Sequence, residues 1–243
     1  MMARAKGIAA RHLKRAIKDP ALREQLTPTY EMGCKRILIS NDYYPALAQD
    51  NVQLVTVGIK EVRERSIVTA DGAVHTADTI IFGTGFRVME LPWAKLIRGK
   101  GDRTLGEVLG DSPRSHLGTT FPGFPNLFLL QGPNTGLGHN SVVLMIEHQI
   151  RHILKAIKYM RKTKAVAIEA TPAAVARFTT YIDRRMRGTV WTSAGCRSWY
   201  LDMTGRNSAL WPSFVFEFGR QSRRFRPSDF SISSSAGARG TSD

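Results

Sequence analysis

The spacing of apolar side chains divides the chain into segments of helical period and segments of strand-like period. Residues 3–18 repeat apolar positions at helical spacing, with Leu13 and Ile17 on one stripe. This pattern predicts a helix that ends or bends at Asp19-Pro20, because the residue before a proline is disfavoured in helical conformation.

Short apolar runs of strand length are scattered through the next part of the chain. They are Arg36–Ser40, Val52–Val57, Ser66–Thr69, Thr79–Phe82 and Leu127–Leu130. Asp71-Gly72 is a turn signal, which predicts a hairpin between Ser66–Ala70 and Val74–Thr76. The last two runs are expected to be buried strands, since glycine-rich turns follow both of them.

The second half predicts two longer helices. Ser141–Met160 is amphipathic, and Asn140 or Ser141 is its natural N-cap. Its apolar face consists of Val142, Val143, Ile146, Ile150, Ile153, Leu154 and Ile157. Pro172 opens another helix, which runs toward Met186. Alternating aromatic residues at 214–218 predict a strand.

Composition adds limits on the class of protein. A length of 243 residues with 42% hydrophobic residues suits one large or two small globular domains. Cys34 and Cys196 have no metal-ligand spacing and form no disulfide framework, so they indicate a reducing compartment and a disulfide is not assumed. No apolar run approaches the roughly 20 residues of a membrane span, and no secretory signal follows the basic N-terminus. We therefore expect a cytoplasmic protein.

The formal net charge of +15 raises the alternative of a nucleic-acid-binding protein. Residues 1–23 supply +6 of it, and the rest is spread along the chain. Aromatic residues do not interleave with these charges, as a single-strand platform would require. The pattern favours a solvated basic face, and no specific nucleic-acid partner is expected.

Candidate chemistry gathers at Phe124–Glu147, where a strand, a glycine-rich loop (Gly132–Gly138) and a helix follow one another. Such an arrangement brings backbone N–H groups and the positive end of a helix dipole together, which suits an anionic or carbonyl edge of a nucleotide cofactor. However, the chain has no G-x-G-x-x-G motif that follows a strand and opens a helix.

Four motifs in order resemble the class B flavoprotein monooxygenases, in particular the Baeyer–Villiger type. They are GCKRILISNDYYPAL (33–47), DTIIFGTGF (78–86), FPNLFLLQGPNTGLGHNS (124–141) and WTSAGCRSWYLDMTGRNSALWP (191–212). The resemblance covers residues 3 to 226 and is to the C-terminal half of such enzymes. It implies an α/β fold, namely a partial two-dinucleotide-binding-domain flavoprotein architecture.

The resemblance also implies a domain plan. Residues 1–86 correspond to the C-terminal part of an NADPH-binding domain, and 87–226 to the C-terminal part of an FAD-binding domain, with an interdomain crossover at 87–123. Residues 227–243, rich in Ser and Gly, are expected to be a disordered tail. The glycine motifs for FAD and NADPH and the F-x-G-x-x-x-H-x-x-x-[WF] fingerprint are absent, so a truncated member, a gene fragment or one piece of a split protein is expected.

The sharpest candidate residues are Lys35 and Arg36. The resemblance implies that Arg36 is catalytic and lies beside the flavin, where its permanent charge stabilises anionic oxygen adducts. It implies that Lys35 binds the 2′-phosphate of NADPH. Two solvated cations at the start of a strand are the structural alternative.

Further cofactor-binding positions follow from the same resemblance. They are Thr84, Gly85, Gly132, Pro133, Asn134, Asn140, Ser141, Val142 and Trp199. The residues at 132–142 are assigned to the pyrimidine edge of the flavin and Trp199 to the nicotinamide, with packing roles as the alternative. Asn207 and Trp211 could shape the substrate side.

Histidines offer weaker candidates. His139 could act as a general acid or base, although a structural role beside a helix cap is favoured. His148 and His152 have a spacing that could suit a metal, but Glu147 and Arg151 indicate a polar solvent face, so no metal is expected.

The implied function is FAD- and NADPH-dependent oxygenation of a ketone or heteroatom by O2, through a C4a-peroxyflavin. One rival is a non-catalytic remnant or a half that needs a separate N-terminal partner, and a homo-oligomer is also open. A basic nucleic-acid binder is the second rival.

Overall fold

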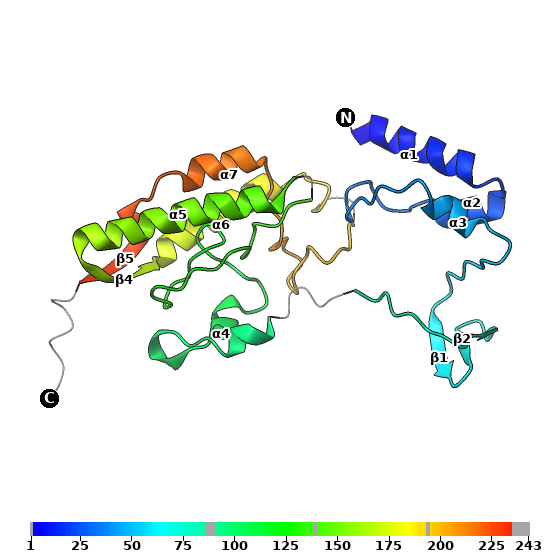
Figure 1. Cartoon of the computed structure of the whole chain (residues 1–243), viewed down its shortest axis with the longest axis horizontal. Helices are drawn as coiled ribbons and strands as arrows, with labels where there is room; N and C mark the ends of the chain where they lie inside the picture. Colours follow the sequence, from blue (N-terminus) through cyan, green and yellow to red (C-terminus); the bar gives the residue numbers. More distant parts are fainter. Residues whose placement is uncertain (1, 86–90, 139, 193–194, 235–243) are drawn as a thin grey trace. The chain divides into compact units, whose positions relative to one another are not determined.

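The computed structural model describes residues 2–85, 91–138, 140–192 and 195–234, and the chain forms two compact units (Figure 1). The first unit comprises Met1–Met32 and Leu38–Arg87, and the second comprises Gly33–Ile37 and Val88–Asp243. A short segment of the N-terminal region thus belongs to the second unit. Each unit is described by itself.

The first unit begins with helices α1 (Met2–Ala16) and α2 (Pro20–Leu26), followed by α3 (Tyr43–Leu47). Leu13 and Ile17 are buried, as the helical spacing predicts. The helix α1 ends before Asp19, whose side chain accepts a hydrogen bond from the Ala21 amide and caps α2.

A three-stranded antiparallel sheet completes the first unit, in the order β1 (Ile59–Arg63), β2 (Ser66–Thr69) and β3 (Val74–Thr76). The predicted hairpin is confirmed: Gly72 has a φ of +86° in the turn between β2 and β3.

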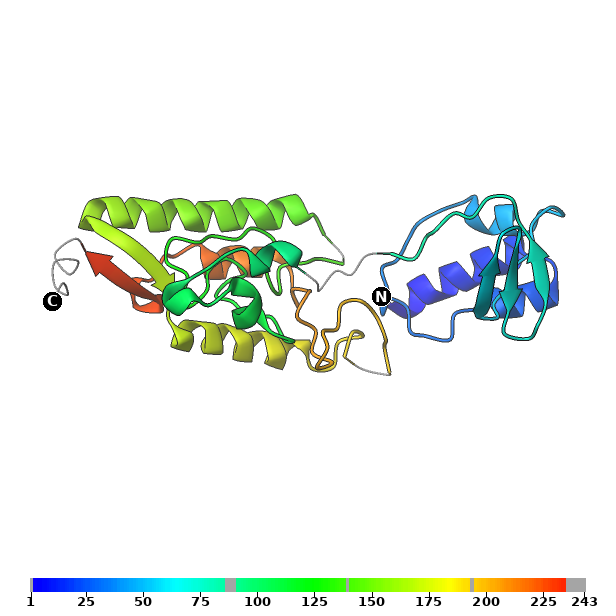
Figure 2. The ribbon, with the colours of Figure 1, turned by 90° about the horizontal axis from the view of Figure 1, so that it is seen from below.

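The second unit holds the longer elements. It contains η1 (Pro92–Lys95), η2 (Lys100–Asp102), α4 (Leu105–Leu109), α5 (Val142–Thr163), β4 (Ala165–Ala170), α6 (Pro172–Met186), α7 (Val215–Ser222), η3 (Pro227–Asp229) and β5 (Phe230–Ser234). Figure 2 shows α5 and α6 on opposite sides of the segments between them. The strands β4 and β5 pair antiparallel.

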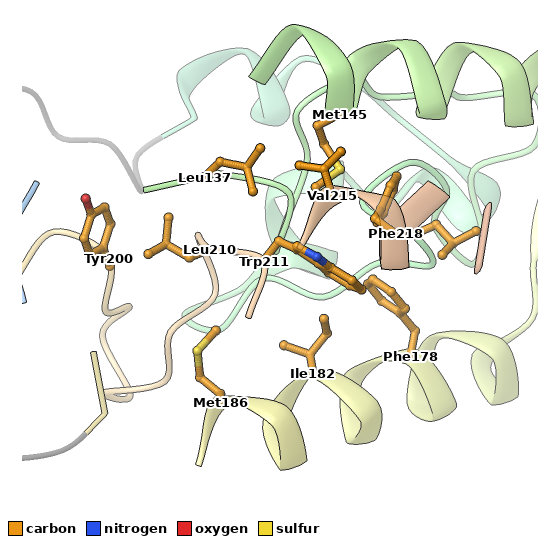
Figure 3. Packing of buried hydrophobic residues seen from close by; sticks show 11 residues of the cluster. Leu137, Met145, Phe178, Ile182, Met186, Tyr200, Leu210, Trp211, Val215 and Phe218 are labelled. Atoms are coloured by element: carbon orange, nitrogen blue, oxygen red, sulfur yellow. The ribbon is translucent and has the colours of Figure 1, made fainter. Parts of the chain in front are cut away.

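The main core of the second unit lies between α5, α6 and α7. Trp211 is fully buried and stacks on Phe178, while Phe218 meets its edge (Figure 3). Its indole N–H donates to the carbonyl oxygen of Phe214. Trp211 is therefore a core residue, and the idea that it shapes a substrate side is wrong.

Several strand predictions fail. Residues 214–218 begin helix α7 instead of a strand, because Val215 and Phe218 are buried while Phe214 and Phe216 are exposed, which is a helical period. The predicted tail also starts too early, since Pro227–Ser234 forms η3 and β5. Residues 235–243 lie outside the described part.

The apolar runs at 36–40, 52–57, 79–82 and 127–130 form no strands in the structure. Ile39 and Ile81 are 97% and 91% exposed. Backbone N–H and C=O groups of a strand need a neighbouring strand to pair with, and among the described residues these runs have no such neighbour.

Residues 91–123, which belong to the predicted crossover, pack as a small subregion of the second unit. Their short helices pack around a buried cluster of apolar side chains, which consists of Ala94, Leu105, Leu109, Phe121 and Phe124. Thr104 caps α4 in a reciprocal pair of hydrogen bonds with Glu107.

Candidate functional site

The glycine-rich loop before α5 is held by the segment that precedes Trp211. The backbone N–H of Asn134 donates to the carbonyl oxygen of Ser208 at 2.8 Å, and the backbone N–H of Gly136 donates to that of Ala209 at 2.9 Å. The Trp211 amide in turn donates to the carbonyl oxygen of Gly136 at 2.8 Å. Two motifs that lie far apart in the sequence are thus joined as one backbone ladder.

Asn134 and Pro133 are buried within this loop. The side-chain nitrogen of Asn134 donates to the carbonyl oxygens of Asn207 and Leu210, and its side-chain oxygen accepts from the Arg206 guanidinium at 2.9 Å. Its polar atoms are therefore engaged inside the protein. Any contribution of Asn134 to a cofactor is through the shape of the loop.

Close contacts with the neighbouring backbone explain why positions 132 and 136 are glycine. A Cβ atom there would lie 2.4 Å from the carbonyl oxygen of Gly118. At Gly136 a Cβ atom would lie 2.9 Å from the carbonyl oxygen of Ala209. Both distances are too short for any larger residue, so these glycines allow the loop to pack tightly.

The loop leads directly into the N-terminus of α5. Ser141 is the N-cap, as expected, but its side chain makes no capping hydrogen bond, and its amide donates to Oδ1 of Asn140 at 2.7 Å. Val142 begins the helix, and the first turn carries no acidic side chain. The positive end of the helix dipole is thus not neutralised by the helix itself.

Helix α5 buries a different face from the predicted one. Its fully buried residues are Met145, Gln149, His152 and Ala156. The predicted apolar face is largely exposed, including Val143, Ile150, Leu154 and Ile157. The buried face is therefore offset by about one residue, roughly 100° around the helix, from the predicted one, and Val142, Ile146 and Ile153 at its border are half-buried.

Gln149 shows why a polar residue is buried on α5. Its amide nitrogen donates to the carbonyl oxygen of Gly118 at 2.9 Å and to the hydroxyl of Thr119 at 3.0 Å, and its oxygen accepts from the Gln131 amide at 3.1 Å. One side chain therefore satisfies several loop groups that would otherwise be buried without partners.

The contacts that join the segment Gly33–Ile37 to the rest of the second unit include a disulfide and a hydrogen bond from an indole. Cys34 and Cys196 form a disulfide, with Cα atoms 5.6 Å apart. The Trp191 indole donates to the carbonyl oxygen of Gly33 at 3.0 Å. The sequence left a disulfide open, and the fold decides it, because residues 162 positions apart meet only in the folded chain.

Trp191 also lies against the glycine-rich loop. A Cβ atom at Gly138 would lie 3.7 Å from Cζ2 of Trp191. The loop and the segment that carries Lys35 and Arg36 therefore share one indole ring. This juxtaposition is the central feature of the candidate site.

Both cations of this segment are exposed. Among the described residues, no carboxylate forms an ion pair with Arg36. Burial raises the pKa of Tyr200, and the nearby Arg36 guanidinium opposes that rise. Trp199 is 49% exposed and its ring lies 4.3 Å from that of Tyr200, centroid to centroid.

Comparison with known proteins finds relatives among the monooxygenases. No family model matches the chain. A Baeyer–Villiger monooxygenase of Streptomyces coelicolor is 45% identical over 229 residues, which is 93% of this chain and 44% of that protein. One of Pseudomonas aeruginosa is 43% identical, over 93% of this chain and 43% of that protein.

Solved structures give the same result. An oxidized steroid monooxygenase bound to NADP is 32% identical, with a TM-score of 0.82 over 96% of this chain and 45% of that chain. Cyclohexanone monooxygenase from Rhodococcus bound to NADP+ is 26% identical, with a TM-score of 0.82.

This chain is homologous to part of a Baeyer–Villiger monooxygenase. It spans less than half of the length of the relatives that it matches. The expected fold class, a partial two-dinucleotide-binding-domain flavoprotein architecture, is confirmed.

The remaining predicted cofactor residues lie in the first unit. Thr84 and Gly85 are exposed, and Gly85 has a φ of +82°, a backbone conformation that favours glycine. Phe86, which closes the same motif, lies outside the described residues.

Arg206 is a residue that sequence reasoning missed. Its guanidinium donates to Asp183 at 2.7 Å, to Asn134 at 2.9 Å and to the carbonyl oxygen of Pro113 at 3.3 Å. It thereby ties α6 to the glycine-rich loop. Arg206 lies within the motif at residues 191–212, which is the feature of the sequence that could have indicated its importance.

Of the histidine candidates, the described pair His148 and His152 belongs to no cluster that could hold a metal ion. His139 lies outside the described residues. His152 is buried, with Nδ1 2.9 Å from the carbonyl oxygen of Ser222, and His148 contacts Gly219 of α7. Glu147 and Arg151 are exposed, as the expected solvent face requires, His148 is half-buried, and His152 departs from that expectation. No group suited to a metal ion occurs among the described side chains.

Two hollows of the second unit lie away from these residues. One of about 410 Å³ is lined by Phe128, Ile157 and Met160, and one of about 450 Å³ by Pro172, Val175 and neighbours. No predicted cofactor residue lines either hollow. In the part of the chain that is described, no helix has the length and apolar character needed to cross a membrane.

Proposed function

We propose that this chain forms part of an FAD- and NADPH-dependent monooxygenase that oxygenates a ketone, or a soft heteroatom, with O2. The observation that carries the proposal is the meeting of loop 132–138 and the Lys35–Arg36 segment at Trp191. The relatives named Baeyer–Villiger monooxygenase support it. When bound, FAD reduced by NADPH would supply the activation of O2.

The residues present fit one side of a flavin. The amides of Ser141 and Val142 lie at a helix N-terminus without acidic residues in its first turn, which favours a carbonyl or anionic edge. A ligand there would compete with Asn140, whose side chain accepts from the Ser141 amide. Gly132 and Pro133 would set the shape of the loop around it.

Arg36 is proposed as the catalytic cation. It is exposed, and its guanidinium would stabilise negative charge that develops on oxygen during the reaction. Lys35 is proposed to bind the 2′-phosphate of NADPH, and Trp199 to contact its nicotinamide. Thr84 and Gly85 are proposed to serve the junction of the two cofactor domains.

A second polypeptide region is proposed to complete the site, because the chain contains no phosphate-binding glycine motif. The exposed apolar face of α5, with Val143, Ile150 and Leu154, supports this, since such faces are normally covered. The occupant would be the part of the relatives that this chain does not match, supplied by a separate partner. A cytoplasmic location stays a prediction.

The proposal is tested by complementation. The full chain is co-expressed with the unmatched part of the Streptomyces coelicolor relative, and the purified complex is examined for bound flavin and ketone-dependent NADPH oxidation. We expect stoichiometric flavin in the complex and little in the chain alone. A complex without flavin would instead support the non-catalytic remnant.

Arg36→Ala tests the assigned role within that complex. We expect flavin reduction by NADPH to persist and oxygenation to fall by about 100-fold or more. Arg220→Ala, at an exposed arginine of α7, is the matched control. Oxygenation by Arg36→Ala at the parent rate would show that the role is wrong.

A further inference from the structure

We propose that the Cys34–Cys196 disulfide is a redox-cleavable link that sets the position of the Lys35–Arg36 pair. The link itself needs no cofactor, and only its consequence for oxygenation rests on the proposed function. Cys34 and Cys196 would be positioning residues that act through Arg36.

The first argument is the course of the chain. Residues Gly33–Ile37 belong to the second unit, although the residues on both sides of them belong to the first. So short a segment has no core of its own, and its anchors include the disulfide and the hydrogen bond from Trp191 to Gly33. The place of Arg36 therefore depends on these anchors.

The second argument is what each cysteine carries. Cys34 is followed directly by Lys35 and Arg36, while Cys196 lies just before Trp199 and Tyr200. The disulfide holds the two segments close together, and the Arg36 guanidinium accordingly acts to lower the pKa of the Tyr200 phenol. One covalent bond thus joins the two segments that supply candidate residues.

The link can be opened by a dithiol reductant. A thiolate of the dithiol attacks one sulfur to form a mixed disulfide, and its second thiol then displaces the protein sulfur. In total the dithiol loses two electrons and two protons and becomes a disulfide, while Cys34 and Cys196 become two thiols.

Access to the bond is limited. Cys34 is 1% exposed and Cys196 is 9% exposed, so local opening must precede attack, and Cys196 offers the easier approach. In a cytoplasm that contains dithiol reductants, the state of the bond would follow the redox state of the cell. The fold would thereby couple the location of Arg36 to that state.

Indole N–H exchange in the full chain provides the test, with tryptophan labelled with ¹⁵N and dithiothreitol as the reductant. Trp191 reports on the segment, because its indole donates to Gly33. Trp211 is the internal control, because its indole donates to Phe214 within the core. Trp191→Phe assigns the signal.

We expect peptide mapping of the alkylated chain to find Cys34 linked to Cys196. Reduction should accelerate exchange at Trp191 several-fold and leave Trp211 unchanged, and the Cys34→Ser/Cys196→Ser variant should match the reduced chain without responding to dithiothreitol. Free thiols at Cys34 and Cys196 in the chain purified without reductant would overturn the proposal. Unchanged exchange at Trp191 after reduction would also overturn it. Loss of protection at Trp191 and Trp211 together would also overturn it, since the bond would then act only on global stability.

A second readout follows Arg36 itself. Arg36→Ala should raise the pKa of Tyr200 in the oxidised chain, because the guanidinium lowers it there, and should have no effect after reduction. Ultraviolet titration with Tyr200→Phe as the reference measures this. An equal shift in both redox states would contradict a positioning role, whatever the outcome of the oxygenation assay.

Discussion

Trp191 donates its indole N–H to the carbonyl oxygen of Gly33 at 3.0 Å, across 158 positions of sequence. The same ring lies 3.7 Å from the Cβ position of Gly138. A single side chain therefore connects the loop before α5 with the segment that bears Arg36. The contact needs both a flat apolar ring and a hydrogen-bond donor at its edge, and the indole of Trp191 supplies both.

Trp191→Phe tests this contact directly. The ring packing against Gly138 is largely kept, but the hydrogen bond to Gly33 is lost, so we expect a loss of about 1 kcal/mol in the free energy of unfolding. Urea unfolding measures it. Trp199→Phe is the control, since Trp199 is half exposed, and a similar loss in both variants would contradict the assigned contact.

Gly132→Ala should destabilise the loop. The added methyl group would lie 2.4 Å from the carbonyl oxygen of Gly118, which forces the backbone to shift at a cost of about 2 kcal/mol or more. Gly58→Ala is the matched control, because a Cβ atom there meets nothing within 4 Å. Equal thermal midpoints for the two variants would argue against this packing.

Arg206→Met removes the guanidinium that joins Asp183 to Asn134. We expect a loss of about 3 kcal/mol, because a buried oxygen of Asn134 and a carboxylate lose their shared donor. Arg184→Met, at an exposed position of the same helix as Asp183, should change stability by less than about 0.5 kcal/mol. Chemical denaturation of both variants measures the two losses in the free energy of unfolding. Similar losses would contradict the assigned role of Arg206 in joining α6 to the loop.

Acid should destabilise the second unit through His116. Burial lowers the pKa of His116 to about 4, although Asp229, with Oδ2 3.7 Å from Nε2, opposes the shift. Burial also lowers the pKa of His152. Because the folded pKa lies below the unfolded value of 6.5, the unfolded state binds more protons, and stability falls as the pH drops from 6.5 toward 4.

For His116 alone this loss amounts to roughly 3 kcal/mol over the whole interval. Denaturant midpoints at pH 7.5 and pH 5 should therefore differ less in His116→Gln than in the parent chain. His75→Gln, in the first unit, serves as the control. An unchanged pH dependence in His116→Gln would assign the acid effect to other groups.

Local sequence signals determined the elements that depend only on neighbouring residues. The hairpin at Asp71-Gly72 and the start of α6 at Pro172 follow from short-range backbone chemistry and are present as predicted, and of the two predicted N-caps of α5, Asn140 and Ser141, the structure selects Ser141. The ordered motifs also sufficed to indicate the fold class that the comparisons confirm.

Tertiary structure decided which faces are buried and which distant residues meet. The amphipathic pattern of α5 predicted its apolar face to be inside, but Gln149 and His152 are inside, because loop carbonyls and α7 supply their partners. The apolar runs at 79–82 and 127–130 could not form strands without neighbouring strands. The Cys34–Cys196 bond and the Trp191–Gly33 contact join residues far apart in sequence, and no local pattern contains information about such closure.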